Sequence, residues 1–154
     1  MQQLIISAMI AFMPLLSFAG GHSGFGGTGA GITIDNEVME GKSGLLVKNT
    51  TSDVWMCENL PEGFPTATSA TCTQFLAFAT GQEQPIGFSF TCLSVDPGGD
   101  ISMSVGAPHE SGRALITQVA GTGKWAAYNG IQFLGGTDFQ IDAATSVYSW
   151  KPIN

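Results

Sequence analysis

The sequence predicts an all-β protein, built as a barrel or a sandwich of short strands. Three observations lead to this prediction. Runs of β-branched and aromatic residues recur along the chain, with turn residues between them. Glycine is abundant, at 21 of 154 residues, which suits many tight turns better than long helices. No segment of useful length has the apolar periodicity of an amphipathic helix.

The composition indicates one globular domain with a polar but charge-poor surface. A chain of 154 residues can bury one moderate core and is too short for two. Hydrophobic residues make up 44% and charged residues only 11%. The net charge of −7 argues against nucleic acid or an anionic membrane surface as partner. It favours a neutral or apolar small molecule, or a cation, although scattered acids also serve solubility.

The amino terminus is typical of a secretory signal, which we expect to span residues 1–19. An apolar run at 4–16 precedes Ser17-Phe18-Ala19, a small-x-small cleavage pattern. The run is too short to favour a membrane span. No basic residue lies near Met1, so the terminal amine must supply the positive charge of the signal. The expected location is therefore secreted or periplasmic.

Residues 20–31 are rich in glycine, and we expect them to form a flexible leader without a core of its own. The barrel domain is then expected to span residues 32–154. His22 lies in this leader, where a solitary histidine is usually solvated rather than a metal ligand.

The β-prone runs predict the strands in order along the domain. Two prolines, Pro61 and Pro65, mark a rigid loop after the third of these runs. The expected strands lie at 32–34, 44–50, 53–57, 72–78, 86–92, 93–95, 101–103, 114–120, 130–134 and within 138–150.

The clearest hairpin joins residues 72–78 to residues 86–92, and its apolar pattern predicts its register. One register places Gln74 opposite Phe90, Leu76 opposite Phe88, Phe78 opposite Ile86, and Cys72 opposite Cys92. One face then becomes almost wholly apolar, as a half-buried strand requires. We therefore expect a Cys72–Cys92 disulfide, with Cys57 left as a buried, inert thiol. A Cys57–Cys72 bridge across the proline loop is the alternative.

A second hairpin is expected through the turn Asp96-Pro97-Gly98-Gly99-Asp100. Leu93 and Val95 would face Met103 and Ile101, which puts apolar side chains at odd positions. Before Cys92 the apolar positions are even. This change requires either a β-bulge near Cys92 or cover on both faces, as in a barrel packed within an oligomer. The two turn carboxylates also suit a calcium ion, but a plain β-turn explains them as well.

Residues 119–130 contain Gly121-Thr122-Gly123-Lys124-Trp125, which predicts a forced chain reversal between strands. A phosphate-binding loop is excluded, because such loops need more glycines and Lys directly before Ser or Thr. The stretch resembles the Gly-Thr-Gly-Lys-aromatic segment late in the dirigent and allene-oxide-cyclase barrel families, and in small secreted bacterial proteins thought to share that barrel. Ala120 departs from a glycine common there, and Tyr128-Asn129 replaces a pair of small residues.

The resemblance extends over residues 72–135 and implies a small antiparallel β-barrel of about eight strands. A lipocalin-like barrel or a β-sandwich is the alternative. These families mainly hold a reactive apolar molecule in a productive shape. Their acidic and ring-binding positions do not carry over, because no matching motif lies outside the glycine stretch.

The sequence contains no recognisable catalytic set. No Gly-x-Ser-x-Gly elbow occurs, no His/Cys cluster has zinc spacing, and His109 lies in an expected surface loop. We expect neither a metal nor a cofactor. The candidate binding residues are Trp55, Glu58, Phe88, Phe90 and Trp125, with Glu58 a proton donor only if it is buried.

Two functions are compatible with these residues. The first is a secreted barrel that binds a small apolar molecule and, if it is an enzyme, steers a cofactor-free cyclisation or isomerisation. The alternative is a non-enzymatic structural or interaction protein with a filled barrel. A homo-oligomer is compatible with both.

The signal sequence leads to a first testable prediction. Export of the full chain should remove the first 19 residues, so that the secreted protein begins at Gly20. Intact-mass measurement of the exported protein checks this directly, and a mass that retains Met1 would contradict it.

Overall fold

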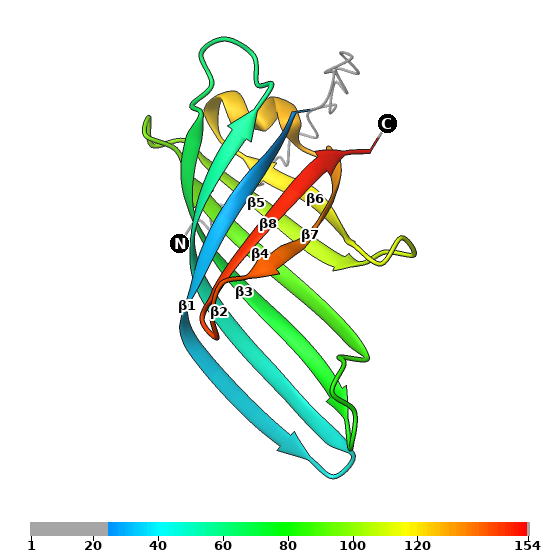
Figure 1. The fold of residues 1–154 in the computed structure, drawn as a ribbon. Helices are drawn as coiled ribbons and strands as arrows, with labels where there is room; N and C mark the ends of the chain where they lie inside the picture. Colours follow the sequence, from blue (N-terminus) through cyan, green and yellow to red (C-terminus); the bar gives the residue numbers. More distant parts are fainter. Residues whose placement is uncertain (1–24, 154) are drawn as a thin grey trace, which may run out of the picture.

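A computed structural model describes residues 25–153, which form a closed barrel of eight antiparallel strands arranged in chain order (Figure 1). The expected all-β barrel of about eight strands is confirmed. The strands are β1 (Gly26–Gly41), β2 (Gly44–Glu58), β3 (Ala67–Ala79), β4 (Gly87–Val95), β5 (Ile101–Pro108), β6 (Ala114–Gly121), β7 (Gln132–Gln140) and β8 (Thr145–Pro152). A short 3-10 helix, η1 (Gly123–Tyr128), connects β6 to β7.

The glycine-rich start of β1 corrects the expected leader. Residues 26–31 are the first half of a strand, so the barrel begins before Ile32. The signal, residues 20–24 and His22 lie outside the described residues. Gly27, Gly29 and Gly31 are buried on the inner face of β1. A Cβ atom at these positions would clash with the side chains of Trp150, Tyr148 and Asp53, respectively. These glycines make room for large neighbours rather than making the chain flexible.

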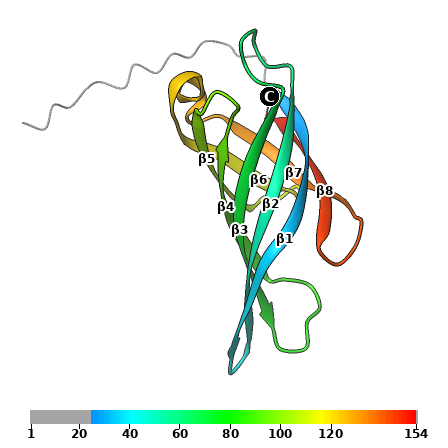
Figure 2. The ribbon, with the colours of Figure 1, turned by 90° about the vertical axis from the view of Figure 1, so that its left-hand side faces the viewer.

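One wall of the barrel is longer than the rest. β1 pairs with β8 only over Gly27–Ile32, but it continues along β2 to the turn between Gly41 and Gly44, past a register shift next to Ile34. The β1–β2 hairpin and the end of β3 therefore extend beyond the closed part, as Figure 2 shows. The two strands expected at 44–50 and 53–57 are one continuous strand, β2.

The hairpin between β3 and β4 has the predicted register. Cys72 pairs with Cys92, Gln74 with Phe90, and Leu76 with Phe88, while the ladder ends one residue short of the expected Phe78–Ile86 pair. The predicted Cys72–Cys92 disulfide is present, with an S–S distance of 2.04 Å. Cys57 is free, as predicted.

The second hairpin pairs Leu93 with Met103 and Val95 with Ile101, as predicted. Of the two alternatives for the change of parity, the β-bulge near Cys92 is absent, since β4 runs in register on both sides. Instead the inner face turns polar: Ser94 and Asp96 are buried, whereas Leu93 is 60% exposed on the outside. The apolar residues of this hairpin thus belong to the outer surface of the barrel.

The helix η1 lies at one end of the barrel (Figure 1), and a cluster of buried aromatic side chains packs there. We call this cluster the aromatic plug. It consists of five buried residues, Phe25, Trp125, Tyr128, Phe133 and Trp150. Edge contacts join them, with ring centroids 4.9 Å apart for Phe25 and Phe133 and 5.2 Å apart for Phe25 and Tyr128. The Gly-Thr-Gly reversal is therefore the element that delivers Trp125 and Tyr128 into this end of the core.

Asp96 holds η1 against the β4–β5 turn. Its buried carboxylate accepts a hydrogen bond from the Trp125 indole at 3.0 Å and contacts the Lys124 ammonium at 2.6 Å. It also accepts hydrogen bonds from the backbone N–H groups of Gly98 and Asp100. Asp100 binds the same Lys124 at 3.3 Å. The sequence left open whether Asp96 and Asp100 bind calcium or belong to a plain β-turn. In the structure they lie in a turn, and Lys124 pairs with both carboxylates.

The inward glycines of β1 generate a stability prediction. Gly29→Val should lower the free energy of unfolding by about 2–3 kcal/mol and Tm by about 5–10 °C, because the new side chain overlaps the Tyr148 ring. Ala30→Val, on the outer face of the same strand, is the matched control and should leave Tm nearly unchanged. Thermal unfolding followed by circular dichroism measures both, and equal shifts would contradict the assignment.

Candidate functional site

The barrel interior contains a cavity of about 560 Å³ next to the aromatic plug. Four of the candidate binding residues line it, namely Trp55, Phe88, Phe90 and Trp125. Phe88 and Phe90 thus border open space instead of filling the barrel. Glu58 does not line the cavity: it lies on the outer face at the end of β2 and is exposed. The condition for Glu58 as a proton donor, burial, is therefore not met.

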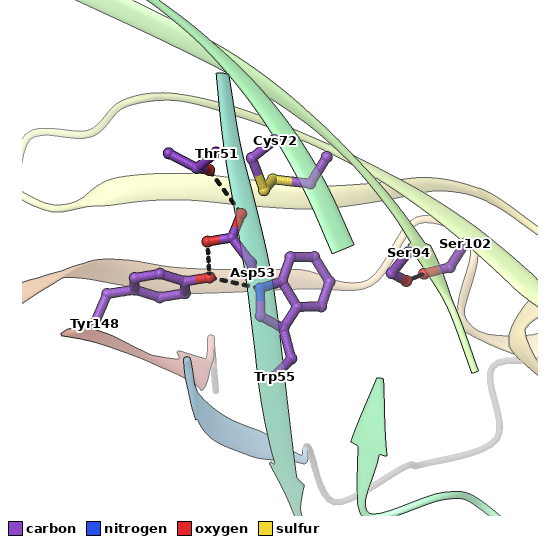
Figure 3. The surroundings of a disulfide bond; sticks show 8 residues. Thr51, Asp53, Trp55, Cys72, Ser94, Ser102 and Tyr148 are labelled. Atoms are coloured by element: carbon purple, nitrogen blue, oxygen red, sulfur yellow. Dashed lines mark hydrogen bonds between the residues drawn. A yellow bond between two sulfur atoms is a disulfide. The ribbon is translucent and has the colours of Figure 1, made fainter. Parts of the chain in front are cut away.

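A buried acid that the sequence analysis did not single out lies in the cavity wall instead. Asp53 of β2 is only 4% exposed. Its carboxylate accepts a hydrogen bond from the Thr51 hydroxyl at 2.6 Å and another from the Tyr148 hydroxyl at 2.7 Å. The Trp55 indole N–H donates to the Tyr148 oxygen at 2.6 Å. Figure 3 shows this chain of hydrogen bonds beside the disulfide.

Strand alternation explains why these side chains meet. Thr51, Asp53 and Trp55 occupy successive inward positions of β2, and Tyr148 projects inward from β8. Both strands flank β1, whose inward residues at this level are Gly29 and Gly31. Because these two glycines have no side chain, Asp53 and Tyr148 reach across β1 to each other. The sequence contained one signal for this site: Asp53 lies in the middle of a run of β-branched and aromatic residues, where a carboxylate is unusual.

Burial dominates the electrostatics of the wall. It raises the pKa of Asp53, although the hydrogen bonds from Thr51 and Tyr148 act in the opposite direction. The pKa of Tyr148 is raised as well, first by burial and then by the charge of Asp53. Burial raises the pKa of the Cys57 thiol to about 11, so this cysteine is protonated and unreactive at neutral pH.

Small hydroxyl groups line the cavity on β3, β4 and β5. Ser94 and Ser102 hydrogen-bond to each other at 2.7 Å, and Ser104 lies beside the disulfide in the next row. Thr68 of β3 pairs with Trp55 across the β2–β3 ladder and is 4% exposed. Its hydroxyl oxygen has no hydrogen-bond partner among the described residues. A buried hydroxyl without a partner is unfavourable unless something in the cavity binds it.

Arg113 also borders the cavity, and residues of β7 and β8 engage its guanidinium. It donates to the backbone oxygen of Ser149 at 3.1 Å and lies 4.0 Å from Asp138. Ser149 lies between the inward residues Tyr148 and Trp150, so it is on the outer face of β8. Asp53 and Arg113 are therefore the acidic and the basic residue of the described cavity lining, and Arg113 pairs with Asp138 rather than with Asp53.

Other chemistry finds little support in residues 25–153. No three His, Cys, Asp or Glu side chains in this range lie together as metal ligands would. The His109 ring is engaged by Ser111 in the β5–β6 turn and is not among the residues that line the cavity. No helix in the described part of the chain has the length and apolar character needed to cross a membrane.

Comparison of the chain with protein-family models, curated protein sequences and solved structures finds no match. The eight-stranded antiparallel barrel agrees with the fold that the Gly-Thr-Gly-Lys-aromatic resemblance implies, and membership of those families does not follow from it.

The two buried carboxylates predict opposite pH effects on stability. The pKa of Asp53 is raised above its ordinary value of 3.8. Its contribution to the stability of the folded protein is therefore fully present below that value and is lost as pH rises through the folded-state pKa. Asp53→Asn should therefore gain in Tm relative to the native protein between about pH 4 and about pH 7.

Asp96 should behave in the reverse way. Its hydrogen bond from Lys124, above all, lowers its pKa, so its contribution is present above the ordinary value of 3.8 and is lost as pH falls through the folded-state value. Asp96→Asn should thus lose Tm relative to the native protein as pH rises from about 2 to about 5. Calorimetric Tm series for both variants measure the slopes, and slopes of the same sign would refute the two assignments.

Proposed function

We propose that this protein is an exported barrel that binds one small, mainly apolar molecule in its interior. The observation that carries the proposal is the cavity of about 560 Å³ inside the barrel, whose exposed surface is mainly apolar although polar residues also line it. Ligand sites are typically concave, mostly apolar and equipped with a few polar groups that fix orientation. The Asp53–Tyr148 pair and the Thr68 hydroxyl are such groups.

The open end of the barrel supports entry of an apolar molecule. A row of four apolar residues crosses the extended wall from strand to strand, in the order Val38, Val47, Leu76 and Phe88. Leu76 and Phe88 also line the cavity, while Val38 is 54% exposed. The row therefore provides a continuous apolar path from the surface to the interior, opposite the aromatic plug.

If the protein is an enzyme, the wall favours a cofactor-free isomerisation or cyclisation. A cavity that holds a flexible reactant near its reactive geometry lowers the barrier without further machinery. Asp53 adds a base that hydrogen bonds from Thr51 and Tyr148 orient, with a pKa that burial raises above its ordinary value. Such a group suits removal of a proton from a bound molecule and its return at another atom.

Export is supported by the disulfide. Cys72–Cys92 is a bond that persists in oxidising compartments, and it lies in the wall of the same cavity. Together with the predicted signal, it favours a secreted or periplasmic location.

The rival function, a structural or interaction protein, has one supporting observation. Leu93, Val95 and Ile101 form an exposed apolar patch on the outer face of β4 and β5. Patches of this kind often mark contacts between proteins, so a homo-oligomer agrees with either function.

Titration with Nile red, a neutral apolar dye, tests cavity binding. We expect saturable binding at one site per chain, and loss of it in Ser104→Phe, whose new ring occupies the cavity beside the disulfide. Val105→Phe is the matched control, because the neighbouring residue projects from the opposite face of β5. Fluorescence at fixed dye concentration gives both affinities.

Absence of saturable binding, or equal binding by Ser104→Phe and the native protein, would refute the proposal in favour of the rival function. Native mass spectrometry of protein from its own host provides a second measurement. A co-purifying apolar molecule is expected, and it should be missing from Ser104→Phe.

A further inference from the structure

The basic side chains of the protein leave the buried carboxylate of Asp53 without a partner of opposite charge. All five basic residues of the chain lie in the described range. Lys48 pairs with Glu37, and Lys124 pairs with Asp96 and Asp100. Arg113 borders the cavity but is engaged by Ser149 and Asp138. Lys42 and Lys151 are exposed. No basic side chain therefore pairs with the buried carboxylate of Asp53.

The contacts of Asp53 leave positions for a ligand. Thr51 donates to one carboxylate oxygen and Tyr148 to the other, so each oxygen keeps a further accepting position. These neutral donors orient the carboxylate but do not balance its charge. A buried carboxylate is favourable when a cation with its own hydrogen-bond donors binds it.

Two further features of the wall suit a protonated amine. The unpartnered hydroxyl of Thr68, one inward row away, accepts hydrogen bonds and has none among the described residues. Tyr148, which donates to Asp53, belongs to a series of three aromatic rings from β2 and β8: Trp55 lies 5.7 Å from Trp150, and Tyr148 lies 6.3 Å from Trp150, between ring centroids. Aromatic faces attract cations through the negative charge of their π-systems.

We propose that the ligand is an amphipathic amine, in which a protonated amino group binds Asp53 and Thr68 and an apolar ring or chain packs on Trp55 and Trp150. The net charge of −7 agrees, since it raises the local concentration of cations around the protein. This inference rests on the proposed function, because it specifies the chemical class of the molecule in the same cavity.

Three indole compounds that differ only in their polar end test the inference: tryptamine, its neutral analogue tryptophol, and indole-3-propionate. Calorimetric titration at neutral pH should give tryptamine about tenfold or more tighter binding than tryptophol, as expected for a charge-assisted hydrogen bond, and indole-3-propionate the weakest binding. The native protein alone yields this comparison, so it does not depend on a variant that folds.

Two variants assign the effect to its residues. Asp53→Asn, nearly identical in shape, should reduce tryptamine affinity about tenfold and leave tryptophol affinity nearly unchanged. Thr68→Val should weaken binding of both compounds, since it removes the hydroxyl without changing the volume. Asp35→Asn is the control for net charge, because it removes one carboxylate from the exposed β1–β2 hairpin.

Equal affinity for tryptamine and tryptophol in the native protein would overturn the inference, as would a preference that survives in Asp53→Asn. Nile red titration of the same samples separates the two proposals. If Nile red binds in the cavity and tryptamine has no advantage, the amine inference fails and the proposed function stands. If neither compound class nor the dye binds, both fail.

Discussion

Closure of the barrel depends on the pairing of β1 with β8, and this pairing depends on inward positions of β1 where glycine has no side chain. At three successive inward positions β1 carries glycine, and at each of them a larger residue from β2 or β8 occupies the space. The rings of Trp150 and Tyr148 reach the interior only because Gly27 and Gly29 leave them room. The aromatic side chains of the interior and the glycines of β1 therefore pack together, because each ring occupies space that a glycine leaves free.

The two ends of the barrel are built differently as a consequence. At one end η1 carries Trp125 and Tyr128 into the plug, and Asp96 keeps that helix in place through Lys124 and the Trp125 indole. At the other end β1, β2 and β3 continue past the closed ladder without a cover. The barrel thus carries packed aromatic residues at one end and an extended wall with apolar residues at the other.

The middle of the barrel has a composition that packing alone does not explain. A filled small barrel is lined by aliphatic side chains, whereas this one presents Asp53, Thr68 and a pair of serines to open space. Burying a carboxylate without a cation lowers stability at neutral pH, and burying a hydroxyl without a partner lowers it further. Residues that lower stability in this way commonly belong to functional sites, where a ligand compensates for them.

The sequence by itself determined the features that depend on neighbours along the chain or on one hairpin. The β class, the turn after Val95 and the register that joins Cys72 to Cys92 follow from alternation and turn residues, because a slip of one residue would expose the apolar face. Alternation says which residues share a face. It does not say which face is enclosed once the sheet closes.

That second choice was made only by the tertiary structure. Even positions of β4 line the interior along the whole strand, although after Cys92 the odd ones, Leu93 and Val95, are the more apolar, because closure assigns the inner face to the side that continues from Cys92. The same choice buries Asp53 and exposes Glu58 five residues later. It also decides that Gly27, Gly29 and Gly31 form a strand rather than a leader, since the residues that need their space come from β2 and β8, far away in the sequence. Pairing between distant strands, which no local pattern contains, is the physical reason.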